Sequence, residues 1–523
     1  MKKLPSRIML SVAGLASAFA GLAAFVVHQS ARATPTASET AHPGAVFADG
    51  CRAPTNSVHH VYYVDPLRGK ASNDGSASSP WNNLQNVLVT KKFILRGGDI
   101  IYLMSGNHGA IRIVDSVNSD FITIQAAPGQ RPLLTALTIR GGQNWIIKGV
   151  KIQSLGSNAL LDVGTSNVGI ASKNIMFVGN EISSSDDVSG WSKADWVAKA
   201  SHGINIDGRP DIVDIDSPIV NGERASHHAT TCITVSDNVI THVKTAATFE
   251  ADRSHFDNNT IDDYADDAVD FGGNFLTLSR NKISNVNDIA DDIHDDGFQG
   301  FLPNGTGYNA ASFSNVVIDH NVIVRQTNPQ LNYPTAMQGI DNFDGGGHRD
   351  WYNLKVTNNI AILNIWNCIS FGGVHDSVIA NNICLADGVK TISQLGSGAT
   401  IKAPGDVAQI SVTDYNHFSK KSSNVLVSNN IATAVDGTQA TDRTVVFKNN
   451  VVSAILAFYE NGKPGWYSLA GAYNDPSGNK NIIDPRLTKY FVDVRSATTR
   501  YGPMRVYTPV WKPRSPYANL GPR

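Results

Sequence analysis

The chain has 523 residues, of which 17% are charged and 41% hydrophobic, so it is neither a disordered chain nor a bundle of membrane helices. Its formal net charge of -2 argues against a nucleic-acid binder, because such proteins carry a basic domain. The 45 glycines, together with many Asn and Asp, predict frequent turns rather than long helices. Repeat folds reach this length as a single unit.

The first residues have the pattern of an export signal. A basic stretch at residues 2–7 is followed by residues 8–27 without a charge, and residues 31–33 offer an A-x-A cleavage site. We therefore expect a signal peptide over residues 1–33. The alternative is an uncleaved membrane anchor, because the apolar run is just long enough to span a bilayer.

The predicted domain order follows from this signal. Residues 34–57, rich in Ala, Thr, Ser and Pro, are expected to form a flexible leader, and residues 58–523 a single exported domain with its terminal cap segments. The expected location is secreted or periplasmic. Four cysteines (Cys51, Cys232, Cys368 and Cys384) are too few for a disulfide scaffold, and none has CxxC spacing. Export permits a disulfide, but Cys384 lies in an apolar strand and is predicted to be a buried thiol.

One short pattern recurs along the chain: alternating apolar residues, then Asn, then apolar-x-apolar or a close variant. VVIDHNVI (316–323) and LKVTNNIA (354–361) are examples. Four intervals between successive asparagines are 21, 22, 23 and 20 residues, which matches a coil of short strands joined by turns. The asparagines of the pattern are Asn180, Asn238, Asn259, Asn281, Asn321, Asn359, Asn382, Asn430 and Asn450.

The recurrent asparagine suits the corner of such a coil. Asn tolerates the left-handed conformation that tight turns need. Stacked inside the coil, its amide can also bond the Asn above and below it, which satisfies polar groups that would otherwise be buried alone. The alternative is a series of ordinary β-hairpins with Asn turns. The predicted fold class is all-β: a right-handed single-stranded parallel β-helix (solenoid) with loop insertions and an N-terminal export segment.

Segments at both ends of the main body support a family resemblance. VYYVDPLRGKASNDGSASSPWNNLQNVL (61–88) with GGDIIYL (97–103), and NIIDPRL (481–487) with SPYANLGPR (515–523), resemble the opening and closing segments of secreted bacterial β-helix proteins. With the Asn-terminated coils, the chain resembles the pectate-lyase-like superfamily over most of residues 58–523. The resemblance implies the fold but does not select a function, because the superfamily contains lyases, hydrolases, epimerases and adhesins.

Carboxylates are concentrated in the middle of the chain. The interval from Glu250 to Asp296 holds thirteen acidic residues and only three basic ones. Most of the acids lie in DDYADDAVDF (262–271) and DDIHDDGFQGF (291–301), and AMQGIDNFDGGG (336–347) follows one coil later. Because Asp and Asn are also common turn formers, about half of these acids are expected to have no other role.

The coil period predicts how these segments stack. Aligning ADDAVDF with HDDGFQG places Asp267 above Asp296 and Asp270 above Gln299, in coils about 4.8 Å apart. The neighbouring coils extend the two columns into a polar strip, a suitable floor for a carbohydrate groove. The residues they add are Gln338, Asp341, His202, Asn205, Asn367 and Ser370.

Two reactions fit this strip. In a hydrolase, one protonated Asp is the acid and a second carboxylate is the base or nucleophile. In a β-elimination lyase, calcium held by carboxylates neutralises a uronate, and a basic side chain removes the proton at C5. The predicted catalytic residues are Asp267, Asp270, His294, Asp295 and Asp296. The predicted substrate-binding residues are His202, Asn205, Gln299, Gln338 and Asp341, and the predicted calcium ligands are Asp266, Asp267, Asp270 and Asp296.

The sequence does not single out the catalytic base of a lyase. The candidates are Lys244, Arg253, Arg280, Arg325 and Arg349. ADDAVDF and DDGFQGF resemble Asp-containing turns of polygalacturonase-type hydrolases, but the Gly-His-Gly and Arg-Ile-Lys motifs of those enzymes are absent, as is the Asp-Pro-His-Asp motif of alginate epimerases. The preferred prediction is a secreted lyase of an acidic glycan. The alternatives are a glycoside hydrolase with paired Asp carboxylates and a non-catalytic glycan-binding surface protein.

The partner predictions follow. The expected partner is a polysaccharide substrate, without nucleic acid, and with a membrane only if the N-terminal segment is uncleaved. The protein is expected to be a monomer.

Overall fold

The structure is a computed structural model of the whole chain. It describes residues 51–55, 57–90, 94–156, 158–208, 219–220, 223–225, 229–289, 295–300, 311–333, 336–342, 350–364, 367–387, 393–395, 399–401, 408–414, 421–436, 442–452, 457–460, 463–466, 482–483, 494–499 and 502–507. The predicted signal peptide, the closing segment 515–523, His294 and Arg349 lie outside these residues.

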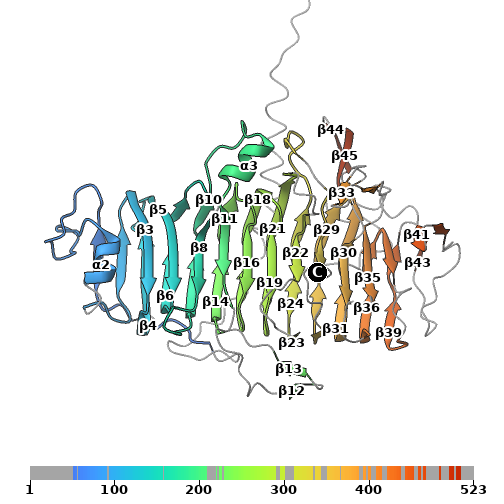
Figure 1. Cartoon of the computed structure of the whole chain (residues 1–523), viewed down its shortest axis with the longest axis horizontal. Helices are drawn as coiled ribbons and strands as arrows, with labels where there is room; N and C mark the ends of the chain where they lie inside the picture. Colours follow the sequence, from blue (N-terminus) through green and yellow to red (C-terminus); the bar gives the residue numbers. More distant parts are fainter. Residues whose placement is uncertain are drawn as a thin grey trace, which may run out of the picture.

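Short strands in parallel register build the molecule, one coil upon the next (Figure 1). Within a strand the inward side chains are apolar and the outward ones polar, as the two-residue period of a strand requires. In β14 and β17, for example, Val235 pairs with Phe256 in the interior and both are fully buried. The predicted parallel β-helix is confirmed.

Each complete coil has three strands. The first strands form most of a 17-stranded sheet: β1 (Val61–Val64), β2 (Ile100–Leu103), β4 (Val117–Ala126), β6 (Gln143–Lys148), β9 (Lys173–Val178), β14 (Thr231–Ser236), β17 (His255–Asp257), β20 (Thr277–Ser279), β24 (Val317–Asp319), β28 (Lys355–Thr357), β31 (Val374–Ala380), β36 (Ser423–Ser428) and β39 (Val445–Lys448). β12 (Ile219–Val220), β13 (Glu223–Ala225), β23 (Ala311–Ser314) and β27 (Trp351–Tyr352) join the same sheet.

The second and third strands form two lines within a 22-stranded sheet, which β3 (Gly106–Val114) and β5 (Pro132–Arg140) begin. The second strands are β7 (Lys151–Gln153), β10 (Glu181–Ser183), β15 (Val239–Thr241), β18 (Thr260–Ala265), β21 (Lys282–Asn287), β25 (Val322–Val324), β29 (Ile360–Leu363), β32 (Ile383–Ala386), β37 (Ile431–Ala432), β40 (Val451–Val452) and β43 (Ile482–Ile483). The third strands are β8 (Ala159–Gly164), β11 (His202–Ile206), β16 (Ala247–Glu250), β19 (Val269–Gly272), β22 (Phe298–Gly300), β26 (Ile340–Asp341), β30 (Asn367–Gly372), β35 (Gln409–Thr413) and β38 (Ala434–Asp436).

The remaining elements are short. Three antiparallel hairpins are β33 (Ser393–Leu395) with β34 (Ala399–Ile401), β41 (Ala457–Glu460) with β42 (Lys463–Trp466), and β44 (Val494–Thr499) with β45 (Gly502–Tyr507). Helix α2 (Leu84–Thr90) lies at the N-terminal end of the stack and buries Leu84 and Val87. Helix α3 (Lys193–Lys199) lies in the insertion between β10 and β11, where Ser192 and Asp195 form a capping box.

The asparagines form a continuous ladder at the turn between the first and second strands. Each is at most 1% exposed, and its side-chain amide bonds the carbonyl oxygen of the next Asn at 2.9–3.1 Å, from Asn180 to Asn450. Each side-chain oxygen also accepts a bond from the backbone N–H of the preceding Asn, as for Asn259 and Asn238 at 3.0 Å. The predicted role of the recurrent Asn is therefore confirmed.

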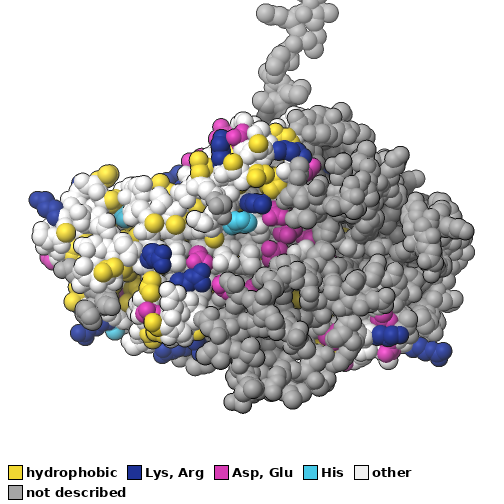
Figure 2. Space-filling model, in the orientation of Figure 1, with side chains coloured by type: hydrophobic (Ala, Val, Ile, Leu, Met, Phe, Trp, Pro, Cys, Tyr) yellow, Lys and Arg dark blue, Asp and Glu magenta, His cyan; other side chains and the backbone are white. Residues whose placement is uncertain are grey.

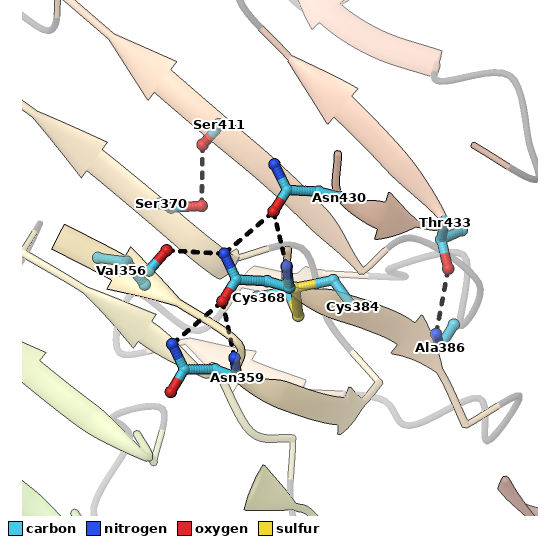
Figure 3. The surroundings of a disulfide bond; sticks show 10 residues. Val356, Asn359, Cys368, Ser370, Cys384, Ala386, Ser411, Asn430 and Thr433 are labelled. Carbon is cyan, nitrogen blue, oxygen red and sulfur yellow. Dashed lines mark hydrogen bonds between the residues drawn. A yellow bond between two sulfur atoms is a disulfide. The ribbon is translucent and has the colours of Figure 1, made fainter. Parts of the chain in front are cut away.

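The prediction for Cys384 is wrong. Cys384 on β32 is disulfide-bonded to Cys368 on β30, inside the coil and close to the asparagine ladder (Figure 3). The two lie only 16 residues apart along the chain, yet their contact depends on how one coil folds back, which the cysteine spacing does not reveal. Cys51 is bonded to Cys232, so the residues at the end of the predicted leader are tied to β14.

Reduction is expected to destabilise the protein. In the chain-entropy model, a cross-link over the 181 residues between Cys51 and Cys232 contributes up to about 5 kcal/mol, and one over the 16 residues between Cys368 and Cys384 about 3 kcal/mol. Urea unfolding with and without a reductant should show a lower midpoint in the reduced protein. Cys51→Ala/Cys232→Ala should reproduce the larger part of the loss, and an unchanged midpoint on reduction would contradict the prediction.

Among the described residues, no helix is both long and apolar enough to cross a membrane.

Candidate functional site

The third strands place one outward-facing polar residue above another through many coils. Asp270 on β19 pairs with Gln299 on β22, and Gln299 pairs with Asp341 on β26. On the other side Asp270 pairs with Thr248, and Thr248 with Asn205. The column thus contains the predicted residues in the predicted order, with neighbours about 4.8 Å apart. From the N-terminal side it runs Asp162, Asn205, Thr248, Asp270, Gln299, Asp341, Ser370 and Ser411.

A second column lies three residues earlier in each coil. Backbone hydrogen bonds between successive coils, such as Ala246 N to Asp267 O and Ala268 N to Asp296 O, set its register. It runs His202, Thr245, Asp267, Asp296, Gln338 and Asn367. The sequence alignment of these segments is thus correct, although the roles assigned to them stay predictions. We call the two columns together the polar strip.

The carboxyl groups of the polar strip, and that of the neighbouring Asp266, are held by defined hydrogen bonds. Asp267 Oδ1 accepts a hydrogen bond from the backbone N–H of Asp296 at 2.8 Å. Asp296 Oδ2 accepts one from Gln299 Nε2 at 2.8 Å, and Asp266 Oδ2 accepts one from Thr245 Oγ1 at 2.9 Å. The arrangement spans three neighbouring coils, so no single segment of the sequence contains it.

These carboxyl groups differ in their exposure to solvent. Asp296 and Asp341 are 0% exposed and Asp295 is 1% exposed, whereas Asp266 and Asp270 are partly exposed. Asp266 and Asp270 are thus less buried than the other acids, although Oδ1 of each is itself buried, and Asp296 acts on Asp270 by its charge.

Burial raises the pKa of the Asp267 and Asp270 carboxyls well above the usual range. For Asp270 the charges of Asp266 and Asp296 raise the pKa further, a hydrogen bond with Asp267 opposes them, and Glu250 adds a smaller rise. Like charges this close disfavour ionisation of both partners. Asp267 and Asp270 therefore hold a proton to higher pH than an ordinary carboxyl group does, next to other acids that accept hydrogen bonds.

Asp266 also has an unusual backbone. Its φ is 93°, whereas the left-handed corner residues Asp237, Asn258 and Arg280 have φ of 59°, 53° and 56°. The value for Asp266 lies outside the small left-handed region that L-residues occupy. Such strain persists only where the surrounding structure imposes it, and it often marks a functional position. The sequence alignment assigned Asp266 only to metal binding.

The sequence analysis did not assign Glu250 or Tyr264 to the candidate site. Glu250, at the end of β16, is 3% exposed and contributes to the raised pKa of Asp270. Tyr264 is fully buried, and burial together with the charges of Asp295, Asp267 and Asp296 raises its pKa well above the usual value. No signal in the sequence separates Tyr264 from an ordinary core aromatic, because its significance comes from the acids of other segments.

Of the candidate bases, the structure brings Lys244 to the polar strip. Burial lowers the pKa of His202, and the charge of Lys244 lowers it further, so His202 is a neutral imidazole near neutral pH. Arg280 instead pairs with Asp257 at 2.5 Å on another face, and Arg325 is fully buried against Asp387. Arg253 lies over the Phe275 ring at 4.8 Å.

The predicted calcium site stays a prediction. Among the described residues, no three His, Cys, Asp or Glu side chains are grouped so that they could hold one metal ion. The oxygen donors of Asp266, Asp267, Asp270 and Asp296 are of the type that calcium prefers, but their geometry supports no step through a metal.

Residues of the insertions pack against one another beside the polar strip. Trp196 of α3 packs in a small apolar cluster that includes Ala265, the residue before Asp266. Tyr333 Oη donates a hydrogen bond to Trp191 O at 3.2 Å, and Lys193 pairs with Asp288 at 2.8 Å. In Figure 2, Asp and Glu side chains gather beside a His where Figure 1 places β11, β16 and β19.

Comparisons with known proteins concern the fold. No family model matches the chain, and no curated protein matches it in sequence. Similar solved structures include the pectate lyase Pel9A, with 15% identity, 75% of this chain and 81% of that chain covered, and a TM-score of 0.35. The catalytic unit of a GH87 alpha-1,3-glucanase from Streptomyces thermodiastaticus has 13% identity, 83% and 68% coverage and a TM-score of 0.40.

A mannuronic-acid-specific polysaccharide family 6 lyase from human gut microbiota has 11% identity, 82% and 92% coverage and a TM-score of 0.38. At these identities and TM-scores the similarity is one of fold and does not indicate a reaction.

Proposed function

We propose that the protein hydrolyses a glycosidic bond of a polysaccharide with a pair of carboxyl groups. The observation that carries the proposal is the presence of two partly exposed acids in one coil: Asp270, whose pKa is raised, and Asp266, which accepts a hydrogen bond from Thr245. Glycoside hydrolysis requires one carboxyl group that donates a proton and a second one that accepts a proton or attacks the sugar. A polymer suits a strip that continues along many coils.

The roles follow from protonation and access. Asp270 donates its proton to the glycosidic oxygen as the bond to the sugar carbon breaks, and Asp266 accepts a proton from the attacking water. The resulting carboxylate of Asp270 and carboxyl of Asp266 then exchange one proton to restore the starting state. Asp267 and Asp296 position this pair, since Asp267 bonds Asp270 as well as the backbone of Asp296.

A lyase of an acidic glycan is the second candidate, and the environment of His202 favours it. A neutral imidazole beside Lys244, in the same column as Asp267, is a suitable base for removing a proton at C5. The carboxylates of the polar strip would repel a uronate, so this reaction needs a cation. Calcium binding therefore stays a prediction tied to this candidate.

One experiment separates the candidates. The protein is incubated with neutral and acidic polysaccharides, with calcium or with a chelator, and both new reducing ends and ultraviolet absorbance of unsaturated uronate are followed. Hydrolysis gives new ends without absorbance. Absorbance that rises with the new ends would replace hydrolysis by elimination, and loss of activity with the chelator would support calcium. No change on any substrate would favour a non-catalytic glycan-binding protein.

The pH dependence of hydrolysis should reveal the raised pKa. Activity needs protonated Asp270, so kcat/KM falls as the pH rises through a pKa well above that of an ordinary carboxyl group. Glu250→Gln removes a neighbouring negative charge and lowers this pKa, so the alkaline limb should move to lower pH. A pH–rate profile of the two proteins checks this, and an unmoved limb would contradict the assignment of Asp270 as the acid.

A further inference from the structure

A serine, a histidine and an aspartate from three neighbouring coils meet outside the polar strip. His375 on β31 pairs in register with Ser423 on β36 on one side and with Tyr352 on β27 on the other. His375 Nδ1 lies 2.8 Å from Ser423 Oγ, and His375 Nε2 lies 3.9 Å from Asp350 Oδ1. All three residues lie at the corner where a coil turns from its third strand into its first. We call Ser423, His375 and Asp350 the corner triad.

Stacking and burial hold the imidazole of His375 in place. The ring stacks on that of Tyr352, with the centroids 4.7 Å apart and the planes at 22°, and His375 is only 6% exposed. Because His375 and Ser423 are register partners on adjacent parallel strands, their side chains point to the same face. The fixed ring therefore presents one nitrogen to the serine and the other to the aspartate.

These two contacts define the role of each ring nitrogen. A neutral imidazole has one N–H donor and one acceptor nitrogen, and a carboxylate only accepts, so the proton belongs on Nε2, toward Asp350. Nδ1 then accepts the hydroxyl hydrogen of Ser423. Nε2 is buried and makes no hydrogen bond among the described residues, and a shift of about 1 Å brings it within hydrogen-bond reach of Asp350. Catalytic hydrogen bonds are often this long before a substrate binds.

The surroundings of the serine indicate the kind of substrate. Ser423 is partly exposed, whereas the other two members of the corner triad are buried. Beside it, Asn424 donates from Nδ2 to Asp376 Oδ1 at 2.6 Å and from its backbone N–H to Thr444 Oγ1 at 2.7 Å, and all three of these polar residues are exposed. A long apolar acyl chain gains nothing from such a surface. A short acyl group on a hydrophilic alcohol, such as a sugar hydroxyl, suits it.

We propose that the corner triad is a second catalytic site, which hydrolyses short-chain carboxylic esters such as the O-acetyl groups of a polysaccharide. Ser423 Oγ attacks the carbonyl carbon while His375 Nδ1 takes the hydroxyl proton. The same proton passes to the alcohol oxygen as the ester C–O bond breaks, which leaves an acyl-serine. Asp350 is a positioning residue that holds Nε2–H and stabilises the imidazolium.

Water completes the cycle. It attacks the acyl carbon and gives a proton to His375 Nδ1, and His375 returns this proton to Ser423 Oγ as the carboxylic acid leaves. The reaction needs no reactant besides the ester and water. It does not depend on the proposed glycoside hydrolysis, which enters only in the choice of a sugar as the alcohol.

The first test uses 4-nitrophenyl acetate, 4-nitrophenyl palmitate and a fluorophosphonate probe of activated serines on the full chain. The acetate should be hydrolysed in preference to the palmitate, and mass spectrometry should find the probe on Ser423. Ser423→Ala should abolish labelling and hydrolysis, and His375→Gln should lower kcat/KM about 10²- to 10⁴-fold. Ser284→Ala is the matched control, because Ser284 is also partly exposed but donates to the carboxylate of Asp262 at 2.6 Å.

Asp350→Asn should lower kcat by up to about 10⁴-fold with little change in KM. The amide N–H would donate to Nε2, which moves the imidazole proton to Nδ1 and leaves no acceptor for the proton of Ser423. Asp350→Glu restores a carboxylate and should recover part of the loss. If both variants lose activity only in proportion to a lower urea midpoint, Asp350 is not part of the site.

Acetate release from acetylated xylan and acetylated mannan tests the sugar ester. Release by the wild type that is lost in Ser423→Ala supports the proposal, whether or not any glycosidic bond is cleaved. Hydrolysis of 4-nitrophenyl acetate without acetate release from either polymer would overturn the sugar ester as substrate. An unlabelled Ser423, with ester hydrolysis that persists in Ser423→Ala, would overturn the second site itself.

Discussion

Asp270→Asn and Asp266→Asn are each expected to lower kcat about 10²- to 10⁴-fold while the protein stays folded. The amide of the first variant has no carboxyl proton to donate, and that of the second cannot accept one. Because the two act as a pair, the double variant should lose little more than either single variant. Turnover on the polysaccharide found by the panel, with unfolding in urea measured in parallel, checks both expectations.

Asp270→Asn is not expected to lower the free energy of unfolding at neutral pH. The folded state holds the proton of Asp270 more tightly than the unfolded chain, so this group opposes folding increasingly as the pH rises through its raised pKa. Asp270→Asn removes that penalty and should be at least as stable as the wild type at neutral pH. Asp257→Asn, which changes an acid of the same coil on another face, is the control and should keep its turnover. Full turnover in folded Asp270→Asn would contradict the assignment of Asp270 as the acid.

Asn259→Ala is expected to lower the free energy of unfolding by about 3–5 kcal/mol. The Asn259 amide donates to Val235 O at 2.9 Å and to Asn281 Oδ1 at 3.1 Å. Its oxygen accepts from the backbone and the side chain of Asn238 at 3.0 and 2.9 Å. All these groups are buried, so the substitution leaves donors and acceptors without partners and without water.

Urea unfolding gives the size of this loss from the midpoint. Asn82→Ala is the matched control: Asn82 is exposed and should change the free energy of unfolding by no more than about 0.5 kcal/mol. If Asn259→Ala and Asn82→Ala unfold at the same midpoint, the asparagine ladder does not stabilise the coils.

Much of the fold could be predicted because its main signal is local. A strand alternates its side chains between two faces, and a corner needs a residue that tolerates the left-handed conformation, so both appear at a regular interval in the chain. The same interval placed Asp270 above Gln299 and Asp267 above Asp296. The register therefore needed no knowledge of long-range contacts.

Several features of the two sites had no such signal. The members of the corner triad come from three separate segments, and no short motif links them in the sequence. The strained φ of Asp266, the influence of Glu250 and the burial of Asp296 each depend on how neighbouring coils pack. The partner of Cys384 was missed for the same reason, since both cysteines point into one interior.

The sequence by itself determined that the chain coils, where its corners lie and which polar residues share a column, because strand period and turn chemistry act between residues near one another in the chain. Only the tertiary structure decided which acids are buried, which have a raised pKa and which are held by an amide or a hydroxyl. Protonation and access depend on burial and on the sum of charges from several coils, and neither quantity belongs to any one segment.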